Sequence, residues 1–127
     1  MTAPALNSAA RIAKALADPQ RMRILNMLRP GERCVCQIVE VLALAPSTVS
    51  KHLSLLEAAD LVASRKKGRW IYYRLPEGAA ATPVRPLLAW LDQALQKDPA
   101  VAADARKLKS IDVRSRTAGC RPSGRKP

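Results

Sequence analysis

The chain has 127 residues, which is room for one domain and little more. Lysine and arginine outnumber aspartate and glutamate 22 to 10, a net charge of +12. The excess does not come from one end, because residues 1–97 hold 14 basic and 7 acidic residues and residues 98–127 hold 8 and 3. Such an excess favours a polyanionic partner, nucleic acid first. No apolar run approaches the roughly 18 to 20 residues that cross a bilayer, and residues 1–10 lack a secretion signal, so we expect a cytoplasmic protein with no membrane partner.

Two helices are predicted at the start of the chain. Residues 7–17 place apolar side chains at helical spacing until Asp18 and Pro19 end the pattern. Pro19 then opens a second helix, whose apolar residues share one face and which ends at Pro30 and Gly31.

Two further helices follow, with a short break between them. From Val35 apolar residues recur at helical spacing to about Leu44, which predicts a short third helix. Pro46 then falls in a turn, and Ser47 or Thr48 can cap a fourth helix that runs to about residue 61. The predicted buried stripe of this fourth helix consists of Val49, Leu53 and Leu56.

The second half of the chain changes character. Residues 61–75 alternate in polarity around a Lys-Lys-Gly tip, which indicates a β-hairpin. A fifth helix with a stripe of leucines is predicted over residues 84–97. Beyond Asp98 the chain could continue as a helix to about Ile111, but the remainder is too polar and too rich in glycine and proline to fold alone. We therefore expect a folded domain over residues 1–97 and a basic, largely disordered tail over residues 98–127.

Two short helices joined by a tight turn and followed by a basic hairpin make a winged helix-turn-helix. The expected fold is thus mainly α, with about five helices and a two-stranded wing. Hydroxyl and basic side chains on the fourth helix suit the major groove, and the hairpin cations suit backbone phosphates or a minor groove. The predicted DNA contacts are Ser47, Thr48, Ser50, Lys51 and His52 on the helix and Arg65, Lys66, Lys67 and Arg69 on the hairpin. The alternatives are that both faces are simply solvated and that His52 packs or caps between helices.

The stretch ERCVCQIVEVLALAPSTVSKHLSLLEAADLVASRKKGRWIYYRL resembles the core of the ArsR/SmtB family of bacterial metal-responsive repressors, whose arsenic and cadmium/lead members carry an ELCVCDL motif here. The resemblance spans about residues 10–95, with Arg33 and Gln37 standing where the family has Leu and Asp. It implies a repressor and not an enzyme, a homodimer built by the first and fifth helices, double-stranded operator DNA as partner, and no catalytic cofactor. The leucine-rich fifth helix, with Trp90 beside its stripe, favours a dimer independently; alternatively it packs only on its own domain.

Cys34 and Cys36 are predicted in the first turn of the third helix, where the helix dipole and free N–H groups favour a thiolate. In a regular helix residues two apart point to nearly opposite faces. We therefore expect the helix to hold the two sulfurs apart, so that one soft ion can take both only by distorting the first turn and moving the fourth helix off DNA. The alternative is a pair of small apolar residues packed at a helix start.

The resemblance implies As(III) or Sb(III) as the inducer, bound by Cys34 and Cys36. Where arsenic members of the family can add a third cysteine this chain has Val39, and its remaining thiol is Cys120 in the tail. The tail is long enough to bring Cys120 to the pair in its own or the other subunit. Cys120 is therefore a third candidate ligand or else an incidental thiol, and the choice among As(III), Sb(III), Cd(II) and Pb(II) stays open.

Other functions are also open. A repressor of the same fold could sense the oxidation of its cysteines, or Cd(II) or Pb(II). A small thiol reductase has little support, because the chain lacks a Cys-x-x-Cys pair and any histidine or acid visibly paired with a thiol. A constitutive DNA-binding protein dominated by its basic tail is a further alternative.

Overall fold

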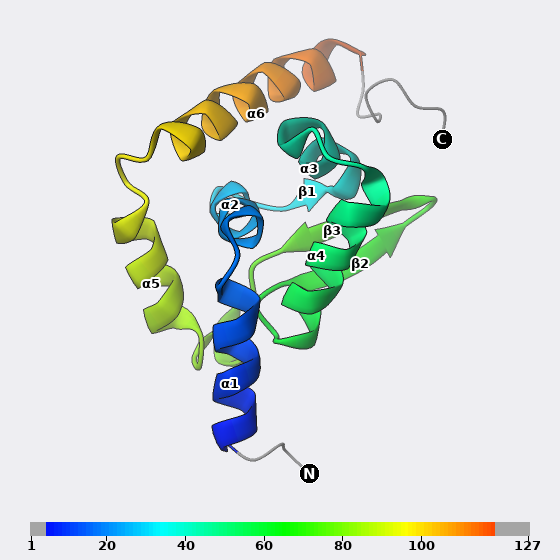
Figure 1. The fold of residues 1–127 in the computed structure, drawn as a ribbon. Coiled ribbons are helices and arrows are strands. Elements are labelled where there is room, and N and C mark those ends of the chain that lie inside the picture. The colour runs from blue at the N-terminus through cyan, green and yellow to red at the C-terminus, as the bar shows by residue number, and fades with distance from the viewer. Residues whose placement is uncertain (1–4, 119–127) are drawn as a thin grey trace.

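The structure describes residues 5–118, with side chains described as far as Arg114, in a computed structural model (Figure 1). Within this range the structure has six α-helices and a three-stranded antiparallel sheet. In chain order the elements are α1 (Ala5–Leu16), α2 (Pro19–Met27), β1 (Arg33–Cys34), α3 (Val35–Leu42), α4 (Pro46–Ala58), β2 (Ala63–Lys67), β3 (Trp70–Arg74), the 3-10 helix η1 (Gly78–Ala81), α5 (Arg85–Ala94) and α6 (Pro99–Ala118). Across the described residues, none of the helices combines the length and apolar character that crossing a membrane requires.

Helix α2 begins where the sequence predicts it. Asp18 is the N-cap, and its carboxylate oxygen accepts the backbone N–H groups of Gln20 and Arg21 at 2.8 and 3.3 Å. Pro19 follows at the first helical position, where its missing N–H group costs no hydrogen bond.

The predicted capping of α4 by Ser47 or Thr48 is wrong. The helix begins at Pro46, with Ala45 at the N-cap and no side-chain hydrogen bond there. Proline fits the first helical position because its fixed φ is already helical. The two hydroxyl residues therefore lie inside the first turn and point to solvent, where both are exposed.

The hairpin forms as predicted, but the sheet has one strand more. Strands β2 and β3 pair so that Lys67 faces Trp70, which leaves a two-residue turn in which Gly68 takes φ +62°, a left-handed conformation that glycine adopts without a Cβ clash. Strand β1 adds to the other edge of β3, giving the order β1-β3-β2. Only two residues long, β1 carries no alternating pattern from which the sequence could predict it.

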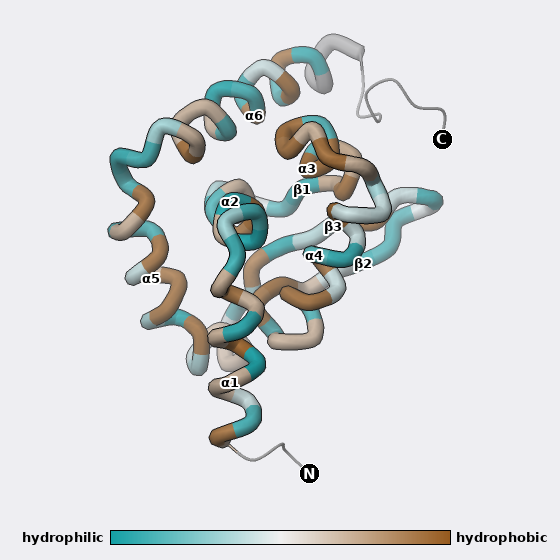
Figure 2. The backbone as a smooth tube through the Cα atoms, viewed as in Figure 1, coloured by the Kyte–Doolittle hydropathy of each residue, from teal (hydrophilic) through white to brown (hydrophobic). Residues whose placement is uncertain are grey.

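The core lies between α2, α3 and α4 and continues under the sheet and α6. The predicted stripe of α4 is confirmed, because Val49, Leu53 and Leu56 are completely buried. Burial of each such side chain is worth about 1.5 to 3 kcal/mol. Figure 2 shows the hydrophobic character of α3 and α5 and the hydrophilic hairpin tip. The other core side chains include Ile24, Leu25, Met27, Leu28, Ile38, Val41, Leu61, Val84 and Leu91.

Residues 99–118 form the helix α6, so the expectation of a largely disordered segment from residue 98 does not hold for them. Leu108 and Ile111 are 4% exposed and belong to the core, and Asp104 is 2% exposed. Figure 1 shows α6 lying across α2 and α3. Its apolar residues are few and widely spaced among alanines. Ion pairs with α2, β1 and α3 and a hydrogen bond from Lys107 to the backbone oxygen of Val41 add to its anchoring, and the local sequence could not show them.

Candidate functional site

The polar residues predicted to contact DNA lie on one face of α4. Ser47, Thr48, Ser50 and Lys51 are exposed, while Val49 between them is fully buried. The helical period produces this separation, since the buried residue turns toward α2 and α3 and its neighbours turn outward. Four of the five predicted helix residues are thus free to meet a partner.

His52, the fifth of these residues, packs against α2. Its Nδ1 lies 3.1 Å from Nη1 of Arg21, whose guanidinium also donates to the backbone oxygens of Ala15 and Lys14 at 2.7 and 3.1 Å. Because a guanidinium can only donate, Nδ1 is the acceptor and the ring proton sits on Nε2. The geometry therefore matches the alternative reading of His52 as a residue that packs between helices.

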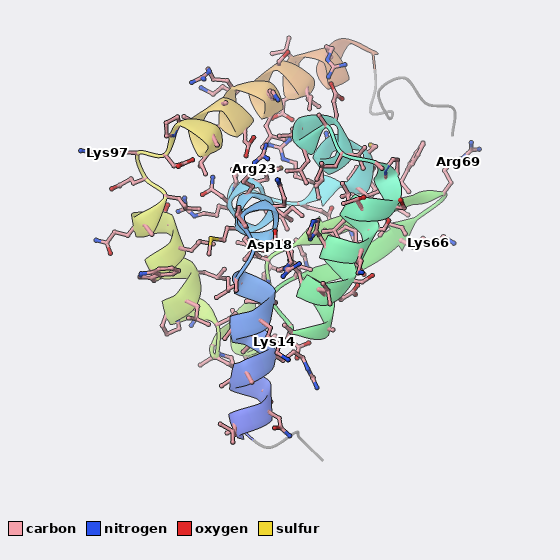
Figure 3. The ribbon with its side chains drawn as sticks, viewed as in Figure 1. Lys14, Asp18, Arg23, Lys66, Arg69 and Lys97 are labelled. Atoms are coloured by element: carbon pink, nitrogen blue, oxygen red, sulfur yellow. The ribbon has the colours of Figure 1, made fainter. Side chains whose placement is uncertain are left out.

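The four hairpin cations occupy two different environments. Lys66, Lys67 and Arg69 are exposed at the tip, and Figure 3 shows Lys66 and Arg69 reaching away from the body. Arg65, near the base, donates from Nε and Nη2 to the two carboxylate oxygens of Glu32, each at 2.7 Å. This bond, first among the causes, holds the pKa of Glu32 below its ordinary value. Arg65 is thus engaged within the protein, whereas the three tip cations are exposed to solvent.

The two cysteines of the Cys-Val-Cys motif meet. Cys36 donates its thiol hydrogen to the Cys34 sulfur, and the two sulfurs lie 2.8 Å apart. The expectation that the helix holds them apart is wrong, because the regular helix starts only at Val35. Cys34 is the N-cap, with extended angles of φ −69° and ψ 144°, so its side chain turns toward that of Cys36. Both are buried, Cys34 with 1% and Cys36 with 9% of its surface exposed.

The surroundings of Cys34 favour its thiolate. The hydrogen bond from the Cys36 thiol is the largest cause, burial opposes it, and the backbone N–H groups of Cys36 and Gln37 add to it, so that the pKa of Cys34 falls to about 7. The Gln37 side chain in turn accepts the backbone N–H of Cys34 at 3.0 Å. Gln37, which replaces the family's aspartate, therefore completes the helix cap without adding a negative charge next to the sulfurs.

This pair has the chemistry of a soft-ion site. Two polarisable sulfurs in contact, one of them readily ionised, favour a thiophilic ion over a hard cation. Among the residues that the structure describes, no three His, Cys, Asp or Glu side chains gather to form a larger ligand set. Cys120, the third predicted ligand, lies outside the described residues.

Segment 32–34, which leads into the thiol pair, is tied to two other parts of the protein. In the sheet, Cys34 is in register with Tyr72 of β3. Arg33 donates to both oxygens of Asp112 on α6, at 2.6 and 3.3 Å. Sequence reasoning missed the parts played by Glu32, Tyr72 and Asp112. The partner of each lies far away in the chain: Arg65 for Glu32, Cys34 for Tyr72 and Arg33 for Asp112.

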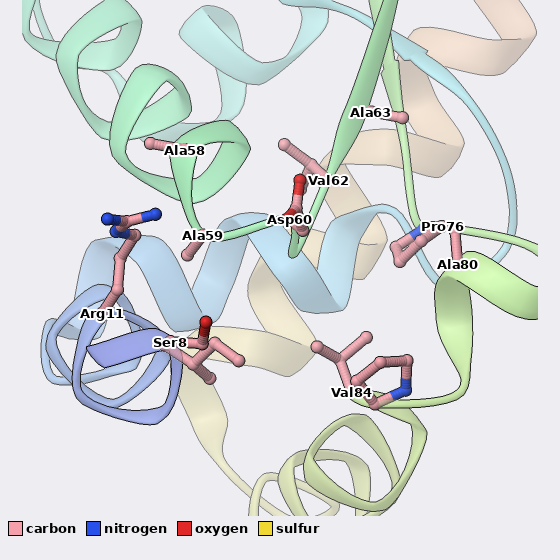
Figure 4. A pocket seen from close by; sticks show the side chains of 12 residues that line it. Ser8, Arg11, Ala58, Ala59, Asp60, Val62, Ala63, Pro76, Ala80 and Val84 are labelled. Carbon is pink, nitrogen blue, oxygen red and sulfur yellow. The ribbon is translucent and has the colours of Figure 1, made fainter. Parts of the chain in front are cut away.

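A cavity of about 550 Å³ lies apart from all of these residues (Figure 4). It opens between α1, the end of α4 and the segment before α5: Ser8 and Arg11 line it from α1, Asp60 and Val62 from the segment after α4, and Val84 from the segment before α5. None of the predicted site residues that the structure describes lines it, so the cavity is separate from the thiol pair and from the exposed face of α4.

Comparison with known proteins places the chain among bacterial regulators. The family model described as "Bacterial regulatory protein, arsR family" matches residues 18–64. The arsenic resistance transcriptional regulator ArsR1 of Pseudomonas putida is 43% identical over 65 residues, 50% of this chain and 51% of that protein. The HTH-type transcriptional repressor SmtB of Mycobacterium tuberculosis is 39% identical over 72 residues, 57% of this chain and 53% of that protein. The chain thus spans about half the length of these relatives.

A solved structure extends the likeness to most of the fold. The homodimeric winged helix-turn-helix DNA-binding domain from Mycobacterium bovis, a possible ArsR-family transcriptional regulator, is 34% identical, with a TM-score of 0.61. The match covers 72% of this chain and 82% of that one. The predicted winged helix-turn-helix is confirmed, and the chain belongs to the arsR family of bacterial regulatory proteins.

Proposed function

We propose that this chain is a transcriptional repressor that binds operator DNA as a homodimer and leaves it when As(III) or Sb(III) binds Cys34 and Cys36. The observation that carries the proposal is the contact between the two sulfurs, 2.8 Å apart, at the junction of the helix-turn-helix and the wing. Relatives named as an arsenic resistance regulator and as a repressor support the class of function.

The DNA-binding part of the proposal rests on α4 and the hairpin tip. Hydroxyls and Lys51 on the exposed face of α4 can donate to base edges or phosphates in a major groove. Lys66, Lys67 and Arg69 at the tip can follow the phosphate backbone beside it. The net charge of +12 supplies the long-range attraction.

A second copy of the chain is the proposed partner of α1 and α5. An open apolar groove of about 480 Å³ lies between these helices, lined among others by Ile12, Leu16, Leu87 and Trp90. Trp90 is 54% exposed, and Leu6 at the start of α1 is 81% exposed. Large apolar side chains left exposed on these two helices favour a protein interface, and the M. bovis relative is homodimeric.

Cys120 is the proposed third sulfur ligand. Trivalent arsenic prefers three thiolates, and the described residues offer Cys34 and Cys36. Asp112, eight residues before Cys120 in the sequence, already lies against Arg33, the neighbour of Cys34. Residues 113–118 continue α6 and rise about 9 Å along its axis, and two further residues span at most about 7 Å. A cysteine at position 120 therefore stays within about 16 Å of Asp112 along the chain, on the side of the protein where Arg33 and Cys34 lie.

The proposal is tested by measuring binding to an operator fragment selected from genomic DNA. Fluorescence anisotropy follows the complex while As(III), Sb(III), Cd(II), Pb(II) or Zn(II) is added, in parallel with Cys34→Ser, Cys36→Ser and Cys120→Ser variants. We expect As(III) and Sb(III) to release the wild-type protein and the first two variants to stay bound. Retained release by the third variant would remove Cys120 from the site, and release only by Cd(II) or Pb(II) would reassign the ion.

The sulfur contact also favours a second candidate signal, oxidation. The Cys34 thiolate can attack a peroxide oxygen; the O–O bond breaks, giving a sulfenic acid and a hydroxide or alkoxide that takes a proton from water. The Cys36 thiol then attacks the sulfenic sulfur, its S–O bond breaks, and the thiol proton leaves with the hydroxyl as water, giving a disulfide. The sulfurs would have to approach from 2.8 Å to about 2.05 Å. Release of DNA by peroxide and its reversal by dithiothreitol, in the absence of arsenite, would assign the repressor to redox sensing.

A further inference from the structure

Glu32 links the thiol pair to the wing. It precedes β1 directly, two residues before Cys34, and its two carboxylate oxygens each accept a hydrogen bond from Arg65 of β2. Both bonds are 2.7 Å long, and a planar guanidinium held at two points by a carboxylate fixes orientation as well as distance. The segment before the thiols and the outer wing strand are therefore joined by side chains across β3, which lies between them.

Tyr72 fills the middle of this link. In the sheet it is in register with Cys34 on β1 and with Arg65 on β2. The Arg65 guanidinium carbon also lies 5.2 Å from the centre of the Tyr72 ring, within range of a cation–π contact. A row of neighbours thus runs across the sheet from the thiol pair to the base of the wing.

On its other side the same segment is held by α6. Arg33 is paired with Asp112, and the Arg33 side chain is only 12% exposed. Cys36 is fixed within α3, whose inner face is packed into the core. Segment 32–34 is therefore anchored to the wing through Glu32 and to α6 through Arg33. A shift of Cys34 relative to Cys36 is transmitted through this segment to both contacts.

Occupation of both sulfurs requires such a shift. Two thiolates that share one ion through bonds of about 2.3 Å lie about 3.5 to 4 Å apart. The sulfurs here are 2.8 Å apart, so they must separate by about 1 Å. Cys34, extended at the N-cap, can move by rotating its backbone without breaking a turn of α3, because α3 starts after it.

We propose that Arg65 is a positioning residue, held by Glu32, through which occupation of Cys34 and Cys36 is transmitted to the wing. This inference rests on the proposed function and names the path by which ligand binding at the thiols reaches the wing. In the empty protein the Glu32–Arg65 pair holds the hairpin in its DNA-binding position; movement of Cys34 releases the pair, and the tip cations lose their alignment with the backbone. Arg65 acts on DNA through the wing and not as a phosphate ligand.

The test compares the ratio of operator Kd values with and without arsenite. Wild type is expected to lose about 100-fold in affinity, within the usual range for allosteric coupling, while Glu32→Gln should lose less than about 10-fold. Glu77→Gln is the matched control, because it removes a carboxylate just after β3 whose side chain is 83% exposed and is paired with Arg74 and not with Arg65. It is expected to keep the wild-type ratio.

A charge exchange strengthens the design. Glu32→Arg combined with Arg65→Glu restores an ion pair of opposite sense, so the arsenite ratio should recover to within about threefold of wild type, even if overall DNA affinity falls. Equal ratios for wild type and Glu32→Gln would overturn the inference. So would a loss of coupling in the exchange variant as large as in Glu32→Gln.

Two measurements separate this inference from the proposed function. Thiol titration after arsenite addition counts the sulfurs that arsenite occupies. If the wild-type protein binds no arsenite, or binds it and stays on DNA, the proposed function itself is wrong, and not only the Glu32–Arg65 route to the wing. In free protein carrying Trp90→Phe, Trp70 of β3 is the single tryptophan. Arsenite should shift the fluorescence emission of Trp70. In a variant that also carries Glu32→Gln, arsenite should still bind but the emission should not shift. An equal shift in both proteins would mean that the signal does not pass through Glu32 and Arg65.

Discussion

Asp104 of α6 accepts two hydrogen bonds from Arg23 of α2, at 2.8 and 2.9 Å, although its side chain is almost completely buried. Arg23 itself is partly exposed, and the bond to Asp104 is the largest cause that raises its pKa. Figure 3 labels Arg23 between the two helices. The pair fixes α6 to the helix next to the thiol segment, so the C-terminal helix is a part of the folded body.

Asp104→Ala is expected to destabilise the protein by about 1 to 3 kcal/mol, because it leaves the Arg23 guanidinium without its charged partner at a largely buried site. Urea unfolding followed by circular dichroism measures the difference. Lys109→Ala, an exposed position on the same helix, is the control and should change stability by less than about 0.5 kcal/mol. Equal stability of the two variants would mean that the Arg23–Asp104 pair adds nothing to the anchoring of α6.

The thiol of Cys34 should titrate near pH 7 in the folded protein, well below the ordinary value of 9.0. Ultraviolet thiolate absorbance follows the titration, with Cys34→Ser as the blank. Cys36→Ala removes the donor that is the largest cause of the shift, and the midpoint should move up toward 9. A midpoint unaffected by this substitution would assign the shift to the backbone N–H groups instead.

The same shift makes stability depend on pH. Because the folded pKa lies below the unfolded one, the contribution of the thiolate is fully present above about pH 9 and is lost as the pH falls through about 7. Under reducing conditions wild type should therefore gain stability relative to Cys34→Ser between pH 7 and pH 9. Chemical unfolding at several pH values checks this, and a difference that stays constant across the window would contradict it.

The dimer proposal predicts that Trp90→Glu weakens self-association by about 30-fold or more, since a central aromatic anchor typically contributes 2 kcal/mol or more to an interface. Sedimentation equilibrium gives the constant. Val113→Glu is a matched control, because Val113 is exposed to a similar degree, 53% against 54%, but lies on α6 away from the groove. Dissociation by the Val113 variant and not by the Trp90 variant would move the interface to α6.

Wing contacts with phosphate should appear in the salt dependence of operator binding. Lys67→Gln at the hairpin tip is expected to lower the slope of log K against log salt by about 1. Lys97→Gln, which removes the same charge at the α5–α6 connection far from the tip (Figure 3), should leave the slope unchanged. Equal effects of both variants would indicate attraction by the net charge without a wing contact.

Much of this protein could be predicted from periodicity. Buried residues of α4 recur at helical spacing, and the hairpin is marked by Gly68 and alternating polarity, so Val49, Leu53, Leu56 and the tip cations were all identified from the sequence. These signals are local, because a helix or a hairpin turn is specified by residues within a few positions of one another.

What the sequence by itself determined is the class of the fold, the basic surface and the presence of two neighbouring thiols. Only the tertiary structure decided that Cys34 falls outside the first helical turn, because β1 pairs with β3 and pulls that residue into extended backbone. It also decided that α6 is folded and that Arg65 is bound to Glu32. Each of these depends on partners 30 or more residues away, and no local pattern records such pairings.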